Sequence, residues 1–224
     1  VNTTQTIPLI AFMASETPAA IGKAKSLAHP GGNLTGFLTD ADPGIVAKRL
    51  QLLREVAPGF TRVGAMVIPE EAIVDGTATE LQSAAGALGL DVHIVGVSSA
   101  AELESAFAQV VQDRIQAIYV SQSPLFLAYR TKLVAKVADV RVPAIYPFRE
   151  FAQTGGLITY GASLPDMYRR AAVYIDKILK GAKPGDLPLQ AAEKYELVVN
   201  LRAAEALGLT ISETFLLRAD EVIE

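Results

Sequence analysis

Short apolar runs alternate with longer amphipathic segments along this chain. The runs of strand length lie at 7–13, 62–68, 92–97, 117–121, 143–146, 157–160 and 195–200. Most of them are apolar throughout, which is typical of strands that are buried on both faces of a parallel sheet. Between them, apolar residues recur at helical spacing, most clearly at 46–57, 103–111 and 167–178. The alternation predicts an α/β fold built from doubly wound parallel sheets, with helices on both faces.

Signals for helix ends agree with this pattern. Asp42 and Pro43 have the residue types of an N-cap and a first helical position, and Ser99 and Glu102 have the spacing of a capping box. The breaker-rich segment 181–188 predicts the end of the helix that precedes it.

Polar residues that follow the predicted strands are the candidate ligand contacts, because ligands of such sheets bind beyond the carboxyl ends of the strands. The segment 146–151 places aromatic rings, a guanidinium and a carboxylate together. Arg149 is suited to a ligand carboxylate, and Glu150 or Glu16 to an ammonium. An equally open alternative is that Arg149 and Glu150 are solvated or pair with each other.

Three aromatic residues complete the parts of an amino-acid site. They are suited to cover an apolar ligand side chain, and they are Phe126, Phe148 and Tyr160. The open alternative is that these rings belong to the hydrophobic core.

Composition narrows the function classes. Half of the residues are hydrophobic, so a packed core is expected rather than disorder. With 24 acidic and 20 basic residues, and no run of Lys or Arg longer than two, no nucleic-acid partner is expected. The longest apolar runs are of strand length, far short of the ~20 residues that span a bilayer.

Motifs for catalysis and cofactor binding are absent from the sequence. Cysteine is absent, and neither His29 nor His93 stands in a metal-ligand spacing, so no metal site is expected. The chain also lacks a nucleophile elbow, a phosphate-binding loop and a dinucleotide fingerprint. These absences favour reversible binding without a cofactor over catalysis.

Seven segments, in the same order as in the family, carry a resemblance that extends over essentially the whole chain. They are 30–36, 48–53, 57–59, 143–151, 155–161, 178–184 and 197–200. The sequence resembles the periplasmic substrate-binding components of ABC transporters with the type I periplasmic-binding-protein fold, within the group related to tryptophan-binding proteins.

The resemblance implies two α/β lobes, joined by three crossovers, that close over a small molecule and deliver it to a permease driven by an ATPase. It implies a non-catalytic, periplasmic or otherwise extracytoplasmic protein whose ligand is an amino acid, in several members an aromatic one. Residues 1–40 and 157–193 would belong to lobe 1, and residues 41–156 and 194–224 to lobe 2.

The resemblance also implies a set of ligand-binding positions. By their places at family strand ends these are Ser15, Glu16, Ser121, Gln122, Ser123, Phe126, Phe148, Arg149, Glu150 and Tyr160. Glu16 stands where the family usually has aspartate.

Family members carry further βα units before the strand predicted at 7–13, so we expect lobe 1 to be incomplete. An incomplete lobe exposes apolar surface and an unpaired sheet edge, which predicts self-association, poor order or dependence on further residues. Two other functions stay open: an enzyme on the same scaffold that depends on Glu150 or Arg149, and the effector-binding domain of a transcription regulator.

Overall fold

The chain forms two compact units. The computed structural model describes residues 4, 6–13, 26–42, 44–74 and 76–224. Unit 1 comprises residues 1–43 and 162–195, and unit 2 comprises residues 44–161 and 196–224. The polypeptide therefore passes from one unit to the other three times. The limits expected for lobe 1 from the sequence differ from the unit boundaries by two to five residues.

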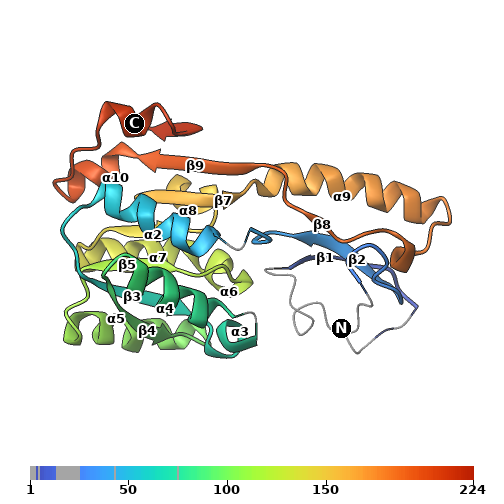
Figure 1. Cartoon of the computed structure of the whole chain (residues 1–224), viewed down its shortest axis with the longest axis horizontal. Helices are drawn as coiled ribbons and strands as arrows, with labels where there is room; N and C mark the ends of the chain where they lie inside the picture. Colours follow the sequence, from blue (N-terminus) through green and yellow to red (C-terminus); the bar gives the residue numbers. More distant parts are fainter. Residues whose placement is uncertain (1–3, 5, 14–25, 43, 75) are drawn as a thin grey trace. The chain divides into compact units, whose positions relative to one another are not determined.

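Unit 2 is built on a seven-stranded sheet with the order β10-β9-β7-β6-β5-β3-β4 (Figure 1). Its strands are β3 (Arg62–Val67), β4 (Asp91–Gly96), β5 (Ala117–Val120), β6 (Ala144–Tyr146), β7 (Ile158–Ala162), β9 (Tyr195–Asn200) and β10 (Glu221–Ile223). The strands from β4 to β7 pair in parallel, as their apolar sequences predict.

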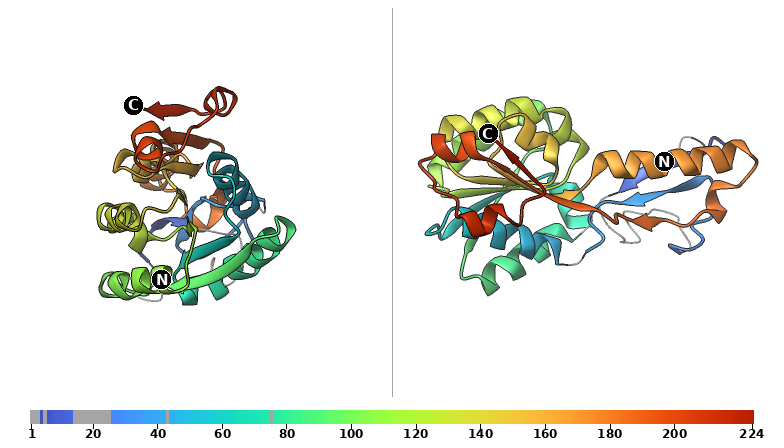
Figure 2. Two further views of the ribbon diagram at one scale, coloured as in Figure 1. Left: turned by 90° about the vertical axis from the view of Figure 1, so that its left-hand side faces the viewer. Right: turned by 90° about the horizontal axis from the view of Figure 1, so that it is seen from above.

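Helices cover both faces of this sheet in two layers (Figure 2). One layer contains α2 (Ile45–Val56), α3 (Pro69–Val74) and α4 (Thr77–Ala87). The other contains α5 (Leu103–Gln112), α7 (Arg130–Val140) and α8 (Arg149–Gln153), with α6 (Pro124–Ala128) leading into α7. The chain ends with α10 (Leu201–Ala206), α11 (Glu213–Leu216) and β10. The doubly wound arrangement expected from the sequence is therefore confirmed for unit 2.

The last two strands of unit 2 break the parallel pattern. The N–H of Asn200, at the end of β9, donates to the carbonyl of Leu157, just before β7 begins, at 2.9 Å. The two neighbouring strands thus run in opposite directions, and β10 runs parallel to β9. The beginnings of β9 and β10 consequently lie at the edge where the parallel strands end.

Unit 1 holds a three-stranded parallel sheet with the order β1-β2-β8. Its strands are β1 (Leu9–Met13), β2 (Leu34–Leu38) and β8 (Gln190–Ala191), and α9 (Leu164–Leu179) packs on β1 and β2. At Gly36 the two strands approach closely, because a Cβ there would lie 1.9 Å from the carbonyl oxygen of Ala11. The positive φ of +149° also favours glycine at this position.

Two details differ from the sequence-based expectations. The helix expected to start at Asp42 and Pro43 begins at Ile45, with Gly44 as its N-cap, so the predicted cap is wrong. Strands β2, β8 and β10 were not predicted. In the described ranges, no helix is both long and apolar enough to cross a membrane.

Candidate ligand-binding site

The carboxyl ends of β3 and β5 form the topological switch point of the unit 2 sheet. From β3 the chain proceeds to β4 on one side and then returns through α5 to β5 on the other. A switch point of this kind leaves a crevice between adjacent strand ends, where ligands of open α/β sheets bind. The candidate site is therefore the set of residues that follow β5, β6 and β7 in unit 2.

Ser121 lies directly at this switch point. Its backbone N–H donates to the carbonyl of Met66, near the end of β3, at 2.9 Å, which ties the two strand ends together. Its side-chain hydroxyl makes no hydrogen bond with any other residue that the structure describes. The hydroxyl therefore has a donor and an acceptor to offer to a ligand.

Other predicted site residues after β5 and β6 stabilise the fold of unit 2 itself. Ser123 is the N-cap of α6, where its hydroxyl accepts a hydrogen bond from the N–H of Leu125 at 3.2 Å. Phe126 and Phe148 are almost fully buried. The structure thus places these two rings in the hydrophobic core of unit 2, as the alternative sequence interpretation expects. Gln122 lies between the two serines and is partly buried.

Glu150 stands in the first turn of α8, immediately after β6. Its carboxylate oxygen Oε2 is buried and has no hydrogen-bond donor among the described residues. A buried acceptor without a donor is costly, so this oxygen is a favourable place for an N–H or O–H group of a ligand. Glu150 does not form an ion pair with Arg149, in contrast to one of the sequence interpretations.

Arg149 instead pairs with two acids from the C-terminal strands. Its guanidinium forms an ion pair with Glu221 of β10, and its Nη1 lies 3.6 Å from Oε2 of Glu196 in β9. Glu196 is buried, with a side chain that is 7% exposed. Together with Glu150, these side chains bring one guanidinium and three carboxylates close to one another, so the charge of this group favours a ligand cation over a ligand anion.

A second arginine, Arg49 of α2, is one of the largest fully buried side chains of the described chain. Its Nε donates to the carbonyl of Tyr160 at 2.7 Å, and its Nη1 to the hydroxyl of Tyr119 at 3.3 Å. Gly161 leaves space for the guanidinium, because a Cβ there would lie 3.0 Å from Nη2 of Arg49. Arg49 therefore fixes the backbone at the end of β7, beside the candidate site.

The sequence analysis did not identify Arg49, Glu196 or Glu221 as site residues. For Arg49 a signal was present, because the residue shares a helix face with the apolar Val46 and Leu53 and so must be buried. The predicted contacts Ser15 and Glu16 lie outside the described residues.

Comparison with known proteins agrees with this fold. The profile of the family "ABC transporter substrate binding protein" matches residues 1–223. A tyrosine-binding protein of Clostridioides difficile is 25% identical over 224 residues, which are 98% of this chain and 63% of that protein. The chain thus spans less than two thirds of the length of this curated relative.

Two solved structures are similar over nearly the whole chain. An ABC domain in complex with L-Trp from Streptococcus pneumoniae is 27% identical with a TM-score of 0.85, over 98% of this chain and 73% of that one. A conserved domain protein from Vibrio cholerae is also 27% identical, with a TM-score of 0.84, over 98% of this chain and 72% of that one. The fold is that of the periplasmic binding proteins, and the chain belongs to the ABC transporter substrate-binding protein family.

Proposed function

We propose that this protein is the extracytoplasmic solute-binding component of an ABC transporter and that it binds an amino acid for delivery to a membrane permease. The family match over residues 1–223 supports the transport role. The names of two relatives, one that binds tyrosine and one that was solved with L-Trp, support an amino acid with an aromatic side chain as the ligand.

One observation carries the location of the ligand on unit 2. Beyond the ends of the neighbouring strands β5 and β6 lie two groups without a hydrogen-bond partner in the described chain, the Ser121 hydroxyl and Oε2 of Glu150. An amino acid supplies complementary groups, because its carboxylate accepts a hydrogen bond from a hydroxyl and its ammonium donates to a carboxylate.

In this proposal Glu150 binds the ammonium group and Ser121 donates to the carboxylate. Arg149 acts as a positioning residue, because two carboxylates already hold its guanidinium. Its single positive charge offsets part of the negative charge of Glu196 and Glu221 at the edge where Glu150 lies, which lowers the repulsion on the carboxylate of a zwitterionic ligand.

Thermal unfolding of the whole chain with single amino acids tests the proposal. L-Tyr or L-Trp at 100 times its Kd stabilises the folded protein by about 2.7 kcal/mol, which raises the Tm by roughly 5 to 10 °C. The N-acetyl derivatives lack the ammonium and should leave the Tm unchanged. If no L-amino acid raises the Tm or gives a signal in titration calorimetry, the proposal is wrong.

Substitution of Glu150 tests the assigned role. Glu150→Gln retains the shape of the side chain but removes the charge, so the affinity for the amino acid should fall by at least tenfold. Glu213→Gln is a matched control, because Glu213 also lies in the first turn of a short helix and is exposed. Equal affinities of the two variants would remove Glu150 from the site.

The fate of the ligand separates binding from catalysis. After prolonged incubation with the protein, the bound amino acid should be recovered chemically unchanged, as shown by NMR spectroscopy or mass spectrometry. Turnover that is lost in Glu150→Gln would instead establish the enzyme alternative.

A further inference from the structure

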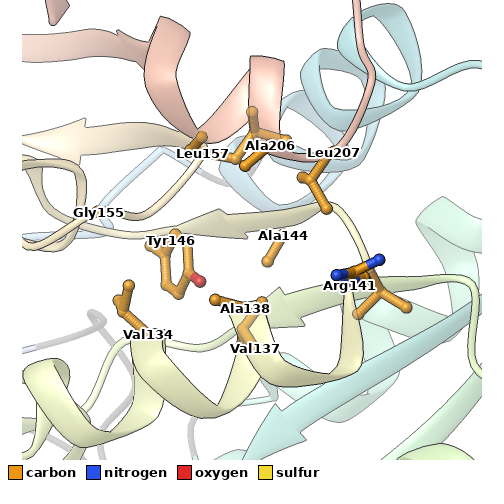
Figure 3. Close-up of a pocket in the computed structure, with 12 residues that line it drawn as sticks. Val134, Val137, Ala138, Arg141, Ala144, Tyr146, Gly155, Leu157, Ala206 and Leu207 are labelled. Atoms are coloured by element: carbon orange, nitrogen blue, oxygen red, sulfur yellow. The ribbon is translucent and has the colours of Figure 1, made fainter.

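A pocket lies in unit 2 on the face of the sheet that α7 covers, and most of its lining residues lie towards the beginnings of β6 and β7. It is bounded by α7, by the beginnings of β6 and β7 and by α10, and its volume is about 240 Å³ (Figure 3). Apolar side chains form most of its wall, among them Val134, Val137, Leu157 and Leu207. The pocket lies entirely within unit 2, and none of the residues that line it belongs to the candidate ligand-binding site.

Tyr146 places a polar group inside this apolar pocket. The residue is 1% exposed, and its ring stacks on Phe151 with a centroid distance of 5.1 Å. Figure 3 shows its hydroxyl pointing into the pocket. The hydroxyl makes no hydrogen bond with any residue in the described ranges. Buried tyrosine hydroxyls usually have a partner, so this one indicates a ligand acceptor.

Burial also determines the state of this hydroxyl. Desolvation raises the pKa of Tyr146 well above its ordinary value of 10.0, so the group stays protonated at neutral pH. It therefore has a proton to donate, and the group best suited to it is an oxygen acceptor.

Arg141 places a cation at the other end of the pocket (Figure 3). The residue is exposed and follows α7 directly, and its guanidinium has no ion pair or hydrogen bond within the described part of the chain. A guanidinium at the mouth of an apolar pocket is suited to a carboxylate, which it binds with two parallel hydrogen bonds.

The volume limits the size of the ligand. Because a cavity of about 150 Å³ accommodates benzene, 240 Å³ accommodates a six-membered ring with short substituents. We propose that this pocket is a second small-molecule site, which binds an aromatic monocarboxylate. The carboxylate lies at Arg141, the ring lies between α7 and α10, and an oxygen substituent on the ring accepts a hydrogen bond from the Tyr146 hydroxyl.

Three probes separate the parts of this proposal in titrations with the whole chain. 4-Hydroxyphenylacetate has both the carboxylate and the phenolic oxygen. Phenylacetate lacks the phenolic oxygen, and 4-methylphenol lacks the carboxylate. We expect 4-hydroxyphenylacetate to bind saturably and about tenfold more tightly than either of the others. If the first probe does not bind saturably, or if all three bind equally, the proposal is wrong.

Variants assign the contacts. Tyr146→Phe should weaken 4-hydroxyphenylacetate about tenfold and leave phenylacetate unchanged, a difference that a general effect on packing would not produce. Arg141→Ala should weaken both carboxylates. Arg114→Ala is the matched control, because Arg114 is likewise exposed and has a similar positive φ, +51° against +52° for Arg141. If Arg114→Ala weakens the probes as much as Arg141→Ala does, the assigned contact is wrong.

A last comparison locates the bound probe. Ser121→Ala should not change the affinity for 4-hydroxyphenylacetate, because Ser121 does not line this pocket. Loss of binding in Ser121→Ala would place the probe in the candidate amino-acid site and overturn the second site, while leaving the proposed function intact. If no amino acid binds but 4-hydroxyphenylacetate still binds at Arg141, the proposed function is wrong and the second site stands.

Discussion

Replacement of Arg49 by methionine should destabilise unit 2 strongly, because the residue is fully buried and its guanidinium is hydrogen-bonded. The side chain is 0% exposed and donates to the Tyr160 carbonyl at 2.7 Å and to the Tyr119 hydroxyl at 3.3 Å. Methionine has a similar length and is apolar, so it fills most of the space but donates no hydrogen bond. The buried hydroxyl of Tyr119 and the part-buried carbonyl of Tyr160 then each lose the hydrogen bond from Arg49.

The expected loss follows from the two bonds. A hydrogen bond to a charged group contributes about 1.5 to 3 kcal/mol, and the 3.3 Å bond belongs at the lower end of this range. Removal of the buried charge returns part of the desolvation cost, so we expect a net loss of about 3 kcal/mol. Out of a total stability of about 5 to 15 kcal/mol, this is a large fraction.

Urea denaturation followed by circular dichroism measures this loss. Lys48→Met is the matched control, because Lys48 precedes Arg49 on the same helix and its side chain forms no hydrogen bond or ion pair with the described residues. The control should remain within about 0.5 kcal/mol of the wild-type protein. A loss below about 1 kcal/mol in Arg49→Met would refute the view that the buried guanidinium holds the ends of the strands.

Two further predictions concern packing and pH. Gly161→Ala should destabilise unit 2 by about 3 kcal/mol, because the new Cβ would lie 1.8 Å from the carbonyl oxygen of Pro147; Gly86→Ala, which meets nothing within 4 Å in α4, should be neutral or slightly stabilising in the same urea titration. The raised pKa of Tyr146 means that above pH 10 the unfolded chain releases a proton that the folded protein keeps, so the free energy of unfolding should fall as the pH rises. Relative to Tyr146→Phe, the wild-type protein should lose about 1.4 kcal/mol between pH 8 and pH 11, and parallel curves for the two proteins would contradict this.

The strands that the sequence predicted are those whose burial leaves a continuous apolar run. β3 and β5 are almost wholly buried, and each appears in the sequence as an uninterrupted apolar segment. The missed strands lack this signal. In β2 the polar Thr35 and Gly36 interrupt the apolar run, and the short strands β8 and β10 each begin with a polar residue, Gln190 and Glu221.

The position of the candidate site could be predicted from the sequence, but the ion pairs within it could not. A polar residue directly after an apolar strand, such as Ser121, can be found in the sequence, and the parallel strands β3 to β7 place their carboxyl ends at one edge of the sheet. The ion-pair partners of Arg149 could not be predicted, because Glu221 is 72 positions away on a strand that no sequence pattern indicated. Which acid neutralises a given arginine depends on the antiparallel course of β9, and the sequence does not encode that direction locally.

The discontinuous make-up of unit 1 has a consequence for the order in which the protein folds during synthesis. The hydroxyl of Thr35 in β2 donates to the carbonyl of Leu187, a residue 152 positions later. At about 5 to 20 residues per second, a ribosome takes roughly 8 to 30 s to synthesise the chain between them. During that interval residues 44–161, which carry most of the unit 2 sheet, are complete and able to collapse, while β1 and β2 still lack both α9 and β8. Strands β1 and β2 therefore leave the ribosome well before the segments that cover them, and of the described strands they most need a chaperone.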